Sequence, residues 1–137
     1  MNAFNRTALK IYGKVQTDVA AEYADSHTLV SMLFNGAIDN LCKAKFNFDT
    51  GDIAARGEAI TKAQQILFGL RSTLDHNEGG DLARLLDSLY DYCIRRLTQA
   101  HAQGESAPVQ EVKGLIGQIR EAWDTIPDQG DLSQVQP

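Results

Sequence analysis

The sequence predicts an all-α protein built as an antiparallel up-down-up-down four-helix bundle. Apolar residues recur at steps of three and four along four long segments, which places them on one face of a helix. Short polar loops separate these segments, and short connections make successive helices antiparallel neighbours. No segment alternates apolar and polar residues with the two-residue period of a strand.

The region 60–100 contains the clearest pair of helices. Its two halves carry matching apolar stripes, at Ile60, Ala63, Leu67, Leu70 and Leu74, and at Leu82, Leu85, Leu86, Leu89, Cys93 and Leu97. The polar stretch between them ends in two glycines, and glycine readily adopts the left-handed conformation that ends a helix. We therefore expect helices over 53–76 and 81–102, with the chain turning at Gly79 and Gly80 and with Gly80 or Asp81 as the next N-cap.

The preceding helix is expected over 27–48, with Asp25 or Ser26 as its N-cap. It carries few charges and two adjacent apolar stripes, Leu29, Leu33, Ala37, Leu41, Ala44 and Phe48 in one, and Val30, Phe34 and Ile38 in the other. A helix that is apolar around much of its girth packs on several sides, so this one should be central. Gly51 should end it, and Asp52 should cap the next helix.

The last helix is predicted from apolar residues at Val109, Val112, Ile116, Ile119 and Trp123. Ser106 is the expected cap, Pro108 fits the first turn, and Pro127 should end the helix. Residues 1–25 are expected to form an N-terminal arm or short helix with one apolar side. The bundle should span 26–126, and 127–137 should be a flexible tail.

Composition excludes several classes of function. The net charge of −5 argues against nucleic acid and against anionic membranes, since both attract clustered Lys and Arg. No run of apolar residues is long enough to insert into a membrane, and the N-terminus lacks the apolar core of a signal peptide. A cytoplasmic (cytosolic) location is therefore expected, with Cys42 and Cys93 as buried, reduced thiols.

The motifs of common enzymes are missing. Neither a Glu-x-x-His pair nor HExxH occurs, and there is no phosphate-binding glycine loop or GxSxG elbow. Asp75, His76, Glu78 and Asp81 cluster near the double glycine, but a solvated polar turn explains them better than a cation site does. We expect no enzymatic activity, no cofactor and no metal.

Apolar residues off the main stripes are the remaining unusual feature: Phe68, Tyr90, Tyr92 and Ile94. Two readings stay open. The bundle and its docked arm bury them all, or some of them line a groove for an amphipathic partner helix.

Three stretches of the chain resemble one known family. They are SHTLVSMLFNGAIDNL at 26–41, AITKAQQILFGLRSTLDHNEGGDLARLLDSLYDYCIRRLTQA at 59–100, and EVKGLIGQIREAW at 111–123. Together they resemble the flagellar secretion chaperone family FliS. The resemblance implies a helical bundle that binds the disordered C-terminal segment of flagellin, prevents its premature polymerisation and aids its delivery to the flagellar type III secretion apparatus. It also implies that an N-terminal segment, with Tyr12 here, covers part of the binding surface.

The residues expected to contact flagellin, or to cover its groove, combine this resemblance with the apolar pattern: Tyr12, Val15, Leu29, Met32, Leu33, Ile66, Leu70, Leu82, Leu85, Leu86, Leu89 and Tyr90. Export-gate components and other flagellar regulators are further candidate partners. The chain is expected to be a monomer or a weak homodimer. The alternative function is an adaptor or regulator that binds a folded partner instead of cargo. It would use charged faces such as Arg95 with Arg96, or Lys43 with Lys45.

Overall fold

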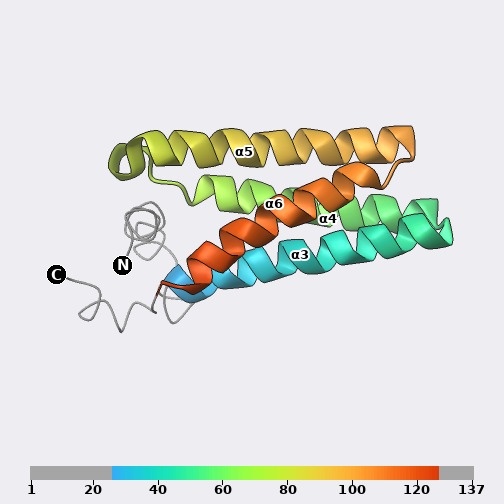
Figure 1. Cartoon of the computed structure of the whole chain (residues 1–137), viewed down its shortest axis with the longest axis horizontal. Coiled ribbons are helices and arrows are strands. Elements are labelled where there is room, and N and C mark those ends of the chain that lie inside the picture. Colours follow the sequence, from blue (N-terminus) through green and yellow to red (C-terminus); the bar gives the residue numbers. More distant parts are fainter. Residues whose placement is uncertain (1–25, 127–137) are drawn as a thin grey trace.

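The computed structural model describes residues 26–126, which form four α-helices (Figure 1). In chain order the helices are α3, Ser26–Thr50, α4, Ile53–Ser72, α5, His76–Gln103, and α6, Ala107–Asp124. Each helix packs against the next, and α6 returns to α3, so the four helices close a ring around one core. The predicted all-α bundle is confirmed over these residues. The expected arm at 1–25 and tail at 127–137 lie outside the described part of the chain.

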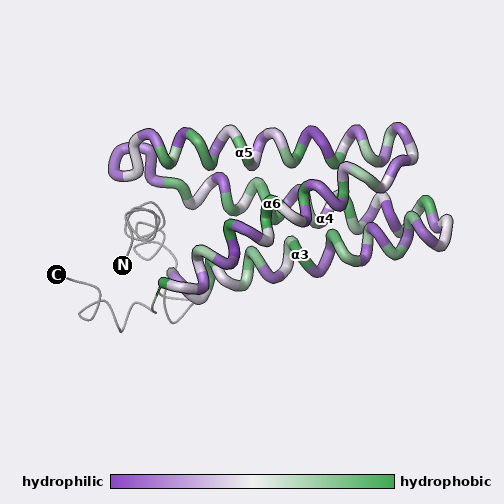
Figure 2. The backbone as a smooth tube through the Cα atoms, viewed as in Figure 1, coloured by the Kyte–Doolittle hydropathy of each residue, from purple (hydrophilic) through white to green (hydrophobic). Residues whose placement is uncertain are grey.

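The core contains the apolar stripes that the sequence indicates. All four helices contribute to it, and its largest fully buried side chains include Phe34, Leu67, Leu70, Leu97, Ile116 and Trp123. Apolar and polar residues alternate along each helix in Figure 2, as expected of helices with one buried face. Removing this apolar area from water is the main stabilising contribution to the fold.

The turn between α3 and α4 follows the local prediction. Gly51 adopts a φ of 74°, a region where residues with a Cβ are strained, and it ends α3. Asp52 is the N-cap of α4, and its carboxylate accepts a hydrogen bond from the Ala55 backbone N–H at 3.0 Å. Both signals act within a few residues, so they could be identified without knowledge of the tertiary structure.

The connection between α4 and α5 differs in part from the prediction, which placed it at the double glycine. α4 ends at Ser72 and α5 begins at His76, because Asp75 acts as an N-cap and accepts hydrogen bonds from the N–H groups of Asn77 and Glu78, both at 3.1 Å. The predicted helix end at His76 is therefore wrong, and Asp75 is a cap that the prediction did not include. Gly80, with a φ of 53° and a ψ of −127°, separates a first helical turn at 76–79 from the longer helix that follows, so the predicted break at the double glycine is confirmed.

The start of α6 matches the prediction in position only. Ser106 is the N-cap residue and Pro108 lies in the first turn, but the Ser106 side chain makes no capping hydrogen bond. Its carbonyl instead accepts hydrogen bonds from the N–H groups of Val109 and Gln110. The expected stop at Pro127 lies outside the described residues, and α6 ends at Asp124.

The two cysteines occupy different environments. Cys93 is buried as predicted, whereas the prediction for Cys42 is wrong because its side chain is exposed. Leu41 occupies the inward position on α3, and its neighbour is rotated about 100° away around the helix axis.

Among residues 26–126, no helix combines the length and the apolar character needed to cross a membrane.

Candidate protein-binding surface

The structure separates the residues predicted to contact a partner into three groups. Met32 and Leu85 are the most exposed, at 54% and 64% of their surface. Five others are half-buried: Leu29, Leu33, Ile66, Leu82 and Leu89. Leu70, Leu86 and Tyr90 are buried in the core, where they support the helices that carry the exposed residues. Tyr12 and Val15 lie outside the described residues.

One apolar surface, the α3–α4 patch, consists of Leu29, Met32, Leu33 and Ile66. Two glycines allow the helices to approach here. A Cβ added at Gly36 would lie 3.2 Å from Cδ1 of Ile66, and one at Gly69 would lie 3.8 Å from Cδ2 of Leu33. The side chains of each helix therefore pack over the bare backbone of the other, and their outer surfaces remain in contact with solvent.

A second apolar surface lies where α5 faces α6. The Tyr92 hydroxyl donates to Glu111 Oε2 at 2.6 Å, and Arg96 Nε donates to Glu111 Oε1 at 2.9 Å. These bonds identify the flank of each helix that faces the other.

Five apolar residues continue along those two flanks, and they define the α5–α6 patch. Leu82, Leu85 and Leu89 precede Tyr92 by ten, seven and three residues, and Leu115 and Ile119 follow Glu111 by four and eight. Such spacings keep residues on one side of a helix. All five are exposed or half-buried, so the patch is an apolar strip. One end of the strip meets the Glu111 cluster, which consists of Tyr92, Arg96 and Glu111.

The Glu111 cluster gives the α5–α6 patch a polar edge. Hydrogen bonds from Tyr92 and Arg96 lower the pKa of Glu111, so that its carboxylate stays ionised. The hydrogen bond to Glu111 raises the pKa of Tyr92, which keeps the phenol protonated as a donor. This edge marks where an apolar partner surface would have to end.

The seam between α4 and α5 is polar by contrast. Arg71 donates from Nε to Asp87 at 2.9 Å and from Nη1 to Asp91 at 3.3 Å, and Gln64 donates to the Ile94 carbonyl at 2.9 Å. The hydrogen bond from Arg71 lowers the pKa of Asp87. The polar groups here bond mainly to each other, which leaves this seam less suited to an apolar ligand.

The two apolar patches lie towards the same end of the bundle but at opposite seams of the ring. That end contains the starts of α3 and α5 and the ends of α4 and α6 (Figure 1). The α3–α4 and α5–α6 seams do not share a helix. A single ligand that contacts both patches must therefore extend around the bundle.

Some of these residues were missed by the sequence reasoning. The sequence analysis does not name Leu115, and it assigns Ile119 to the inward stripe of the last helix. In the structure both side chains are half-buried at the edge of that stripe, beside the buried Ile116. Tyr90 lies in the core and not off its stripe, since it falls four residues after Leu86 and three before Cys93, a spacing that indicates burial. Phe46 and Ile53 are exposed at 63% and 62%, and their spacing carries no signal that separates them from ordinary surface residues.

The acidic residues near the double glycine do not converge. Asp75 is buried and its carboxylate caps α5. Within 26–126, the structure contains no group of three or more His, Cys, Asp or Glu side chains placed to hold a metal ion.

Comparison with known proteins assigns the chain to a family. The family described as flagellar protein FliS matches residues 8–130. The flagellar secretion chaperone FliS of Salmonella typhimurium is 38% identical over 132 residues, which cover 96% of this chain and 98% of the relative. FliS of Vibrio cholerae is 38% identical over 122 residues, with 89% and 90% covered. The flagellar secretion chaperone FliSB of Pseudomonas aeruginosa is 34% identical over 119 residues, with 87% and 94% covered. Because the match extends over most of each chain, this protein belongs to the FliS family of flagellar proteins.

Proposed function

We propose that this protein is a cytosolic export chaperone that binds the disordered C-terminal segment of flagellin. It prevents premature polymerisation and aids delivery of flagellin to the flagellar type III secretion apparatus. The observation that carries the proposal is the apolar surface left over after the bundle has formed, in the α3–α4 patch and the α5–α6 patch. Membership of a family whose relatives are named flagellar secretion chaperones supports it.

The arrangement of the patches suits an extended client. A disordered segment loses conformational entropy when it folds on a partner, so it needs a wide contact to offset that cost. Two apolar patches at opposite seams provide such a contact to a chain that passes around the bundle. A compact folded partner would reach only one of them. Binding of this kind needs no catalytic group and no nucleotide.

The test is calorimetric titration of the full chain with the C-terminal segment of flagellin from the same organism. We expect a one-to-one complex with a clearly negative heat-capacity change, the mark of apolar burial. Met32→Ser and Leu85→Ser should each raise Kd by roughly tenfold, a typical effect of losing an apolar anchor. Ile53→Ser is the matched control, since Ile53 is 62% exposed and belongs to neither patch. Equal Kd values for all three variants and the unchanged chain would refute the assignment of the patches.

The N-terminal arm has a role in the same proposal. Tyr12 and Val15 give the segment an apolar side, and we place it as a lid over part of the surface in the free protein, displaced when flagellin binds. Deletion of residues 1–17 should then change the affinity for the flagellin segment or the solubility of the chain. If neither changes, the lid does not exist.

The adaptor alternative has less support, because two of the charges it would use, Arg96 and Lys45, are in ion pairs and less than a third exposed. Arg95 Nε lies 3.0 Å from Asp91 Oδ2, and Arg96 Nε lies 2.9 Å from Glu111 Oε1. Lys45 Nζ lies 2.7 Å from Asp49 Oδ1. Lys43 is the exception, since it has no ion pair within residues 26–126.

A further inference from the structure

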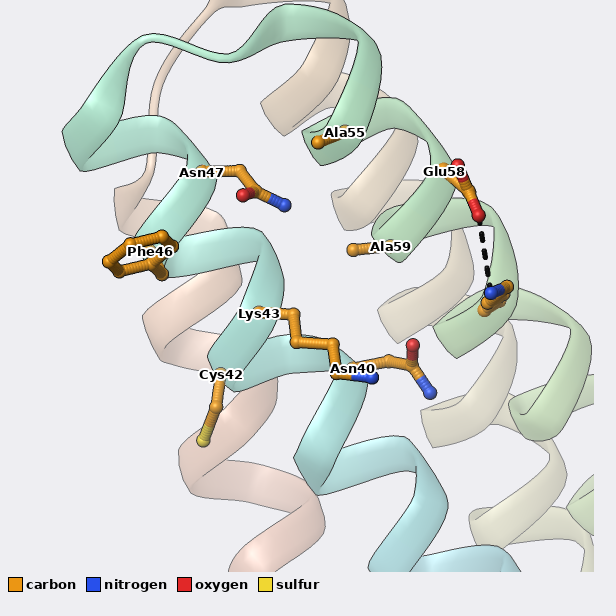
Figure 3. Close-up of a pocket in the computed structure, with 9 residues that line it drawn as sticks. Asn40, Cys42, Lys43, Phe46, Asn47, Ala55, Glu58 and Ala59 are labelled. Atoms are coloured by element: carbon orange, nitrogen blue, oxygen red, sulfur yellow. Dashed lines mark ion pairs between the residues drawn. The ribbon is translucent and has the colours of Figure 1, made fainter.

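A groove of about 470 Å³ lies between the second half of α3 and the first half of α4 (Figure 3). Asn40, Lys43 and Asn47 extend from α3 towards α4, while Phe46 and Cys42 turn away and form the outer rim. The floor and far side come from α4 residues Ala55, Glu58, Ala59 and Lys62. None of these residues belongs to either apolar patch.

The groove exists because side-chain size changes along one helix seam. Towards the start of α3, Leu33 and Ile66 fill the space between the helices. At the groove, the α4 positions facing α3 are Ala55 and Ala59, whose methyl groups leave the space open. Residues of α3 that could fill it, such as Lys43, are long and polar, and it is favourable for them to keep their charge in water.

The charge in the groove has the opposite sign to that of the whole chain. Lys43 is exposed and has no ion-pair partner within 26–126. Lys62 lies 3.2 Å from Glu58, but both side chains are more than half exposed, at 56% and 70%, and such pairs contribute little. The groove is lined by two cations, Lys43 and Lys62, and one carboxylate, Glu58, so its local charge is positive although the chain has a net charge of −5. A positive local charge attracts acidic groups of a partner.

An apolar element accompanies these cations. Phe46 is 63% exposed at the rim, and Ala55 and Ala59 contribute methyl groups to the floor. Apolar contacts flanked by cations are complementary to a helix with one apolar and one acidic face. We propose that this groove is a docking site for an acidic amphipathic helix of a second protein.

Two features of the geometry define the kind of contact. The groove is lined by nine residues, fewer than the roughly 20–30 that each partner contributes to a standard interface, so the contact is transient. Ile66 of the α3–α4 patch lies four residues after Lys62 of the groove, about 6 Å along α4 at a rise of ~1.5 Å per residue, so the groove continues the seam beyond the patch. A client whose contacts end at Ile66 leaves the groove open to the second partner.

The direct test is a titration followed by amide chemical shifts of the full chain. The probe is a synthetic amphipathic helix of leucine and glutamate, about five turns or roughly 18 residues long, together with its lysine counterpart. We expect the acidic peptide to shift amides within 40–47 and 55–62, and the lysine peptide to leave them unchanged. Shifts confined to the two apolar patches, or equal responses to both peptides, would overturn the proposal.

Charge reversal provides the matched variants. Lys43→Glu with Lys62→Glu should weaken binding of the acidic peptide at least about fivefold, since attraction at two sites becomes repulsion. Lys113→Glu with Arg120→Glu makes the same change in net charge on α6 and should leave binding unchanged. Ala55→Trp fills the groove and should also abolish binding. Circular dichroism and unchanged affinity for the flagellin segment confirm that each variant is folded. Equal weakening by both charge-reversed pairs would refute a site at the groove.

Two further results would assign the groove to another occupant and so refute the proposal. A concentration-dependent dimer that is lost in the Lys43→Glu, Lys62→Glu variant would make the occupant a second copy of the chain. Shifts of the groove amides on deletion of residues 1–17 or 127–137, without any peptide, would make it a segment of the same chain.

Discussion

Trp123 on α6 stacks against His27 at the start of α3, with ring centroids 4.7 Å apart and ring planes 17° apart. Its indole Nε1 donates to the Ser31 hydroxyl at 3.0 Å, and only 2% of the residue is exposed. This contact joins the last helix of the bundle to the first. It is one of the contacts that close the ring of four helices, since α6 follows α5 in sequence and reaches α3 only through tertiary packing.

Replacement of this indole should therefore be costly. Trp123→Ala should lower the free energy of unfolding by about 3–5 kcal/mol, the usual cost of removing a large buried aromatic side chain. Ser31→Ala should cost about 1 kcal/mol, since it removes one hydrogen bond. Urea unfolding followed by circular dichroism measures both. Leu85→Ala, at an exposed position, serves as the control with an expected change within about 0.5 kcal/mol. Similar losses of unfolding free energy for Trp123→Ala and Leu85→Ala would contradict the role of Trp123 in holding α6 against α3.

The bridge between Arg71 and Asp87 should make stability depend on pH. Arg71 lowers the pKa of Asp87 below its ordinary value of 3.8, so the folded state binds its proton less tightly than the unfolded chain does. The resulting stabilisation is present above the ordinary pKa and is lost as the pH falls through the lower folded-state pKa.

Asp87→Asn should therefore destabilise the protein at neutral pH by about 0.5–1 kcal/mol, a small value because both side chains are partly exposed to solvent. The difference from the unchanged chain should shrink as the solution is acidified. Urea unfolding at a series of pH values tests this, with Glu58→Gln, from a more exposed pair, as the comparison. A difference that stays constant into acid would show that the effect comes from something other than the carboxylate.

Two glycines in α6 should be replaceable with a gain in stability. A Cβ at Gly114 or Gly117 would meet no atom within 4 Å, and neither residue has a positive φ. Alanine reduces the backbone entropy of the unfolded chain, so Gly114→Ala and Gly117→Ala should each stabilise by about 0.5–1 kcal/mol. Thermal unfolding is a sufficient measurement, and a loss of stability in both variants would refute the open space around them.

Gly57 offers the contrasting case. A Cβ there would lie 3.1 Å from Cε1 and Nε2 of His101, and His101 accepts a hydrogen bond at Nδ1 from Arg56 Nε at 3.2 Å. Because that bond holds the ring in place, Gly57→Ala should gain less than the α6 variants or lose stability. In a His101→Ala background the same change should be stabilising. A double-mutant cycle with no coupling between the two sites would contradict this contact.

The two thiols should differ in reactivity. Burial raises the pKa of Cys93 to about 12, so the reactive thiolate is scarce at neutral and mildly alkaline pH, whereas Cys42 is exposed. A thiol reagent should therefore modify one residue per folded chain, and the second only when urea is added. Mass spectrometry of the Cys42→Ser variant should show no rapid labelling. Rapid labelling of that variant under native conditions would contradict the burial of Cys93.

The parts of the fold that the sequence could predict are those determined locally or by periodicity. Gly51 and Asp52 act within one turn of the backbone, and both behave as expected. The end of α4 was misplaced because Asp75 caps an extra helical turn before the break at Gly80. Leu74, in the loop between α4 and α5, is buried, and its burial depends on the partner helices, which a local motif does not reveal.

The candidate surface was only partly predictable for a related reason. The apolar pattern identifies which helix flanks are apolar, but it does not show which flanks another helix covers. Leu85 and Leu86 are adjacent leucines in the sequence, yet one is 64% exposed and the other 4%. Their difference depends on where α6 crosses α5, a tertiary relationship. The groove at Lys43 and Lys62 likewise depends on the positions of α3 and α4 side by side.

The glycine contacts between α3 and α4 have a consequence for the order in which the molecule opens. Gly36 and Gly69 let these helices approach more closely than larger residues would, whereas the α5–α6 seam retains half-exposed leucines and hydrogen bonds near water. Amide hydrogens in the α3–α4 pair should therefore exchange with deuterium later than those of α6. A helix that loosens before the rest would let the chaperone adjust to its cargo, or release it, without global unfolding.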